Sequence, residues 1–90
     1  MIEVKHATGD EWDISIQGDV VTHHHVRVSA ADLARFGEGQ PAERLLRESF
    51  QFLLEREPNT SILGSFDLSI IGQYFPEYEQ EIRSRLRRTS

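Results

Sequence analysis

The chain has 90 residues, which fits a single domain (1–90), and its 38% hydrophobic and 28% charged residues are ordinary for a globular protein, not for a disordered one. A net charge of −5 disfavours general nucleic-acid binding, and the absence of cysteine excludes disulfides and thiolate chemistry. Because the chain has neither a membrane-spanning apolar run nor the plan of a signal peptide, we expect a cytoplasmic protein with no membrane contact.

Residues 1–29 alternate between apolar and polar side chains, which predicts a three-stranded antiparallel β-meander. Thr8-Gly9-Asp10 and Gln17-Gly18-Asp19 supply turn residues between the strands. One face of the sheet would be apolar and would need a helical cover. The other face would carry the polar side chains of Glu3, Lys5, Asp13, Ser15, Gln17, His23, His25 and Arg27.

Residues 30–57 are predicted to form a helical pair on that apolar face. Ser29 is a suitable N-cap for the first helix, and Gly37-Glu38-Gly39 ends it. The second helix runs from Pro41, which suits a first turn, to Glu57-Pro58. It carries more apolar surface than one small sheet needs, which predicts contact with a second copy of the chain. The predicted dimer interface consists of Leu45, Leu46, Phe50, Phe52, Leu53 and Leu54.

Residues 58–90 are predicted to form a C-terminal helical segment, so the fold class is α+β with two to three helices on one face of the meander. Ser65 is a possible cap for a helix whose apolar residues are Leu68, Ile71 and Phe75. Pro76 starts or kinks a last helix, in which Tyr78, Ile82 and Leu86 recur every four residues. Whether the stretch 59–75 packs within its own subunit or crosses to another stays open.

Three aromatic residues near the C-terminus, Tyr74, Phe75 and Tyr78, flank Pro76 and predict a site for a protein partner. Aromatic side chains in a proline-interrupted segment are frequent anchors at interfaces. They equally often cap a hydrophobic core, so both interpretations stay open at this point.

The consecutive residues His23, His24 and His25 do not form one cluster, because neighbouring side chains of a strand point to opposite faces. His24 would face the helices as a buried, hydrogen-bonded side chain. His23 and His25 would face outward, and Asp13 on the next strand could join them as a third zinc ligand. The alternatives are an exposed polar face without a ligand, and an interface that protonation of the two histidines loosens.

No motif in the chain supports catalysis, and none implies a cofactor. No serine lies in a Gly-x-Ser-x-Gly elbow. The only pair of close glycines, Gly37 and Gly39, encloses an acid that would repel phosphate. We therefore expect the protein to bind a partner and not to catalyse a reaction.

Residues 22–57 carry, in order, T-H-H-H-V-R-V, A-A-D-L-A-R-F and P-A-E-R-L-L-R-E-S-F-Q-F-L-L-E-R, and this order resembles the ribbon-helix-helix module of small bacterial repressors and antitoxins. The resemblance implies a homodimer that shares one two-stranded ribbon, with His23, His25 and Arg27 reading the major groove. The function predicted first is a small bacterial homodimeric interaction or antitoxin-like module. A ribbon-helix-helix DNA-binding regulator and a His-x-His metal-binding domain are the alternatives.

Overall fold

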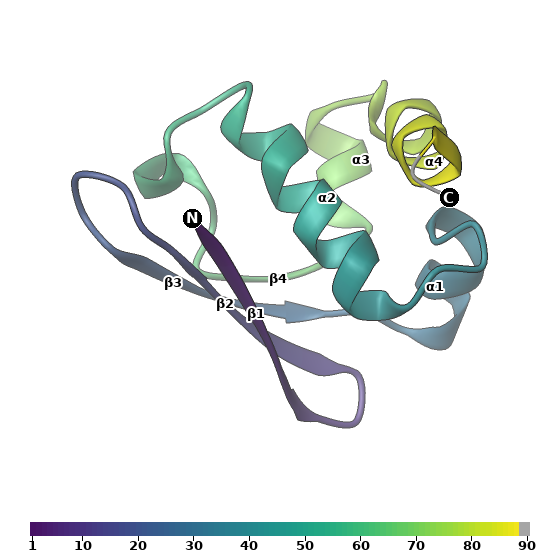
Figure 1. Cartoon of the computed structure of the whole chain (residues 1–90), viewed down its shortest axis with the longest axis horizontal. Coiled ribbons are helices and arrows are strands. Elements are labelled where there is room, and N and C mark those ends of the chain that lie inside the picture. The colour runs from purple at the N-terminus through teal and green to yellow at the C-terminus, as the bar shows by residue number, and fades with distance from the viewer. Residues whose placement is uncertain (89–90) are drawn as a thin grey trace.

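Three N-terminal strands and one short later strand form a single mixed sheet, and the helices cover one of its faces (Figure 1). The computed structural model describes residues 1–88. The strands lie in the order β1 (Ile2–Thr8), β2 (Glu11–Ile16), β3 (Thr22–Arg27) and β4 (Ser65–Asp67). The first three are antiparallel, and β4 is parallel to β3. The predicted α+β class and meander are therefore confirmed.

The helix predicted to begin at Ser65 is wrong, because residues 65–67 form the strand β4. Residues 65–67 pair with 25–27 of β3, about 40 positions earlier in the chain, and Phe66 is the partner of Val26. The bonds flanking this pairing run from the His25 N–H to the Gly64 carbonyl and from the Leu68 N–H to the Arg27 carbonyl. Long-range pairing satisfies this backbone and overrides its weak local helical preference.

The helices are α1 (Ala30–Phe36), α2 (Ala42–Leu54), α3 (Ile70–Tyr74) and α4 (Tyr78–Arg88), and a 3₁₀ turn η1 (Asn59–Ser61) follows α2. The Ser29 hydroxyl accepts a bond from the Asp32 N–H at 3.0 Å, which confirms the predicted N-cap of α1. At its end only glycine fits position 37, because a Cβ there would lie 2.5 Å from the Leu33 carbonyl oxygen. Within residues 1–88, no helix combines the length and hydropathy that crossing a bilayer requires.

The core lies between the sheet and α2, and it continues between α2 and α4. Alternate strand residues point inward, so Ile14 pairs with Val4 on one side and His24 on the other. Tyr78, Ile82 and Leu86, which recur every four residues along α4, are fully buried. Tyr78 shares a buried 2.7 Å hydrogen bond with Ser49 of α2, whose hydroxyl donates to the Leu45 carbonyl. Because Ser49 has one proton, Tyr78 is the donor in this chain of bonds.

The residues predicted to form a dimer interface on α2 are packed inside the single chain, so that prediction is wrong. Leu45, Leu46, Phe50, Phe52 and Leu53 are each 4% exposed or less within a single chain, and Leu54 is half-buried against the same core. The apparent excess of apolar surface is covered by α4: the Tyr78 ring packs on Phe52 at 5.3 Å. A homodimer of this fold would have to use another surface, and its existence stays a prediction.

Candidate functional site

His24 is the inward member of the histidine triplet and is buried and hydrogen-bonded, as predicted. Its Nδ1 lies 2.7 Å from the Leu63 carbonyl oxygen, and its Nε2 lies 2.9 Å from the Thr22 hydroxyl. A carbonyl oxygen can only accept, so Nδ1 carries a proton. The Asn59 amide in turn donates to the Thr22 hydroxyl and to the Val20 carbonyl. This polar chain fixes the loop 59–64 against β3.

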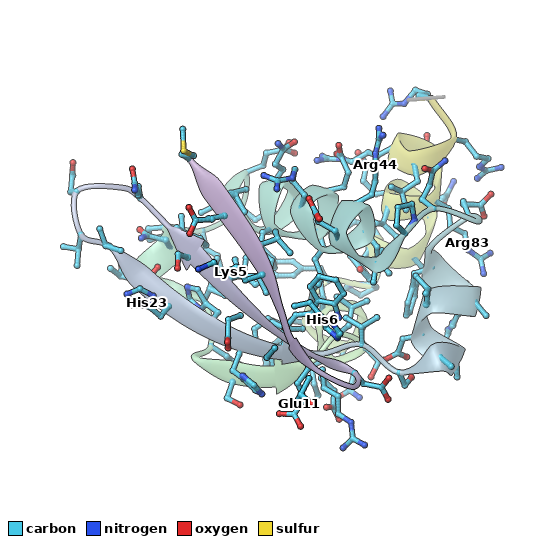
Figure 2. All side chains as sticks on the ribbon, turned by 60° about the horizontal axis from the view of Figure 1, so that its bottom comes forward. Lys5, His6, Glu11, His23, Arg44 and Arg83 are labelled. Carbon is cyan, nitrogen blue, oxygen red and sulfur yellow. The ribbon has the colours of Figure 1, made fainter. Side chains whose placement is uncertain are left out.

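His25 lies on the outer face between two carboxylates (Figure 2 shows this part of the sheet, with Glu11 labelled). Its Nδ1 is 2.9 Å from Asp13, and its Nε2 is 2.5 Å from Glu11. Carboxylates accept only, so both bonds are complete when the ring is a doubly protonated imidazolium. The hydrogen bond to Asp13 and then that to Glu11 raise the pKa of His25 above its ordinary value.

His23 does not join His25 and Asp13 in a metal site. Its Nδ1 instead pairs at 3.1 Å with the hydroxyl of Ser15, the residue directly opposite it on β2. Both ring nitrogens of His25 already face carboxylates. In the described part of the chain, no group of three or more His, Asp or Glu side chains could hold a metal ion. The zinc site predicted from His23, His25 and Asp13 is therefore wrong.

The shared ribbon implied by the family resemblance is contradicted by the sheet order. β3 is an inner strand, with β2 on one edge and β4 on the other, so it offers no edge to a second copy. His23, His25 and Arg27 do project from the outer face, as the resemblance requires. However, Glu11 and Asp67 are the strand neighbours of Arg27, and both would repel phosphate.

The three C-terminal aromatic residues have different environments. Tyr78 is fully buried, so its assignment to a partner site is wrong; burial raises the pKa of its hydroxyl above the ordinary value. Phe75 is half-buried and meets the Phe52 ring edge-on at 5.9 Å. Tyr74 is 67% exposed, and it lies at the rim of a groove.

This groove is an apolar hollow on the described surface. It has a volume of about 420 Å³ and lies between the end of α2, the loop after η1, β4 and α3. It is lined by Leu53, Glu57, Ser61, Ile62, Leu63, Phe66, Ile70, Ile71, Tyr74 and Phe75. Leu63 is 46% exposed, so an apolar rim accompanies the apolar wall. The volume falls in the range of ligand sites, and the lining suits aliphatic or aromatic groups.

Most of the groove lining was not among the predicted site residues. Ile62, Leu63, Phe66, Ile70 and Ile71 lie in the apolar stretch 59–75, whose packing the local pattern did not decide. Their high density of apolar side chains without a helical or strand period was the available signal. Only the pairing of β4 with β3 brings this stretch against the end of α2 and opens the groove.

Comparison with known proteins gives no match: neither a family model, nor a curated protein, nor a solved structure matches the chain.

Proposed function

We propose that the protein is a non-catalytic binding module that holds an apolar segment of a partner protein in the groove between α2, β4 and α3. The observation that carries this proposal is the exposure of Leu63 and Tyr74 at the rim of an apolar hollow. Exposed aromatic and aliphatic side chains around an unfilled apolar hollow are typical of protein recognition sites.

The surroundings of the groove support binding over catalysis. Its polar side chains are those of Glu57 and Ser61, together with the Tyr74 hydroxyl at the rim. Among the described residues, no hydrogen bond joins Ser61 Oγ to a histidine or a carboxylate, so no nucleophile and base are paired there. The hydrogen bond from His24 to the Leu63 carbonyl holds the loop that forms one wall, so the hollow is preorganised.

Linear peptides selected from a phage-displayed library on the immobilised full chain would test this function. We expect selected peptides to be rich in apolar residues and to lose about tenfold or more in affinity for the Leu63→Ser and Tyr74→Ser variants. Both side chains are largely exposed, so these changes leave the fold intact. The matched controls are Val20→Ser and Val21→Ser, which remove exposed apolar side chains outside the groove lining. Equal loss in controls and groove variants, or no selected peptide, would contradict the proposal.

A further inference from the structure

The outer edge of β4 has unpaired backbone groups beside the groove. In a parallel ladder, alternate residues of a strand direct their N–H and C=O groups to the same neighbour. The Gly64 carbonyl and the Leu68 N–H bond to β3, so Phe66 between them also faces β3. Ser65 and Asp67 consequently direct their N–H and C=O groups away from the sheet, which ends at β4 in the described structure. Both residues are exposed.

The opposite edge of the sheet is different. Met1 and Gln17 exchange both backbone bonds, so the outward backbone groups of β1 begin at Ile2. The Arg47 guanidinium of α2 donates to the Ile2 carbonyl at 2.7 Å and occupies the start of that edge. The apolar groove also runs along β4 and not along β1. The two features needed for strand addition, open backbone groups and an adjacent apolar hollow, coincide at β4.

The two faces of β4 differ in chemistry. On the inner face, Phe66 forms part of the apolar groove. On the outer face, a second hollow of about 350 Å³ is lined by Glu11, His25, Arg27, Ser65, Phe66 and Asp67. Successive side chains of an added strand would alternate between these two hollows. The site therefore fits a segment with apolar side chains at every second position.

The charge around β4 indicates which side chains a bound segment would carry at its other positions. On the outer face, the carboxylates of Glu11, Asp13 and Asp67 outnumber the cationic side chains, even when His25 is protonated beside Arg27. Within residues 1–88, no ion pair joins Asp67 or the groove residue Glu57. Lysine or arginine side chains of a bound segment would pair with them. A second copy is a poorer occupant, because each chain has a net charge of −5 and the same carboxylates along this edge.

We propose that β4 accepts an extended, basic segment of a partner protein as a fifth strand, with apolar side chains in the groove and Lys or Arg side chains over Asp67. This inference rests on the proposed function and specifies its partner. The short length of β4 and the charge of Asp67 limit pairing between copies, as is usual for protected sheet edges. A basic strand from a partner would attract Asp67, so the repulsion that limits pairing between copies would not oppose its binding.

The probe is a capped peptide of sequence Lys-Val-Lys-Ile-Lys-Val-Lys, titrated into the isotope-labelled full chain and followed by NMR. We expect the amide protons of Ser65 and Asp67 to become at least about tenfold more protected from exchange, whereas those of Val4 and His6 on the β1 edge stay unchanged. A peptide N-methylated at alternate bonds, so that it cannot pair with β4, should not bind. Asp67→Asn should weaken binding about threefold, and the effect should diminish with salt. Glu3→Gln, on the outer face of the opposite edge strand, is the matched control.

Three results would overturn the inference. Equal binding of the N-methylated peptide, with shifts at groove residues but unchanged exchange at Ser65 and Asp67, would leave the groove function intact and exclude strand addition. The absence of binding at about 1 mM peptide would exclude this class of segment, and the phage selection would then decide the groove function separately. Protection of Ser65 and Asp67 that rises with protein concentration alone would assign the edge to a second copy.

Discussion

His23, His24 and His25 are adjacent in the chain, yet each has different partners. The alternation of a strand sends His24 to the core, where it bonds the Leu63 carbonyl, and leaves the other two on the polar face. The register then separates those two, because Ser15 is opposite His23 whereas Asp13 is opposite His25. The residue type alone therefore does not define a site. The cross-strand neighbour decides what each imidazole does.

The hydrogen bonds of His25 with the carboxylates of Asp13 and Glu11 make a pH-dependent contribution to stability. The pKa of His25 in the folded chain is raised above 6.5, so this contribution is complete below that pH and is lost as the pH rises through the raised pKa. NMR titration of the ring should give a pKa above 6.5 in the native chain. In the Asp13→Asn and Glu11→Gln double variant, the pKa should fall toward 6.5. A native His25 that titrates at or below 6.5 would contradict the imidazolium assignment.

Helix α2 is buried on more than one side, and this explains its unusually apolar sequence. It packs on the sheet and also contacts α4, where the Tyr78 and Phe52 rings meet. The Arg56 guanidinium covers the Phe52 ring at 3.6 Å and pairs with Glu77. An apolar face that a single helix pattern assigns to a second copy is thus covered within the chain. Sequence spacing shows that such a face must be buried, but it does not identify the element that buries it.

Truncation of Phe52 distinguishes an intrachain core from a dimer interface. We expect Phe52→Ala to lower the free energy of unfolding by about 3–5 kcal/mol, because it opens a cavity between α2 and α4. Phe52→Leu should lower the free energy of unfolding by only about 1 kcal/mol. This milder variant allows the measurement if the alanine variant does not fold. Denaturant titrations should give midpoints that do not depend on protein concentration. Midpoints that rise with protein concentration would instead support a subunit interface at Phe52.

At the scale of the whole molecule, charge divides the surface into two regions. Ion pairs link the helices, as between Arg35 and Glu79 and between Arg85 and Glu55. On the exposed sheet face, carboxylates outnumber Lys and Arg, and Figure 2 shows Glu11 there with Lys5, while Arg44 and Arg83 lie on the helical layer. This distribution does not suit a duplex-reading sheet.

The charge distribution predicts that the chain does not retard duplex DNA in a gel-shift measurement at about 0.15 M salt. Phosphates approaching Arg27 would also approach Glu11 and Asp67, its two strand neighbours. The Arg27→Ala variant should behave like the native chain. Salt-dependent retardation by the native chain that Arg27→Ala abolishes would instead support DNA reading by this face.

The N-terminal half of the fold is predictable because its signals are local. Alternation between residues 1 and 29 defines three consecutive strands, and Ser29 and Gly37 define the ends of α1. The candidate site is less predictable, because it is built from the stretch 59–75. Ser65, Phe66 and Asp67 have no strand period of their own, and their conformation depends on β3. Of the groove residues, Tyr74 and Phe75 were among the predicted partner-binding positions, whereas Leu63 and Phe66 were not.

The sequence by itself determined the α+β class, the three-stranded meander, the inward position of His24 and the shared apolar face of Ile82 and Leu86 on α4. These follow from periodicity, which acts between residues close in the chain. Only the tertiary structure decided that α4 covers Phe52, that β4 covers the edge of β3 left open by β2, and that a groove lies beside an open strand edge. Those features depend on contacts between residues far apart in the chain, such as Phe52 with Tyr78 and Val26 with Phe66. Local patterns show that a surface must be covered, but they do not identify the segment that covers it.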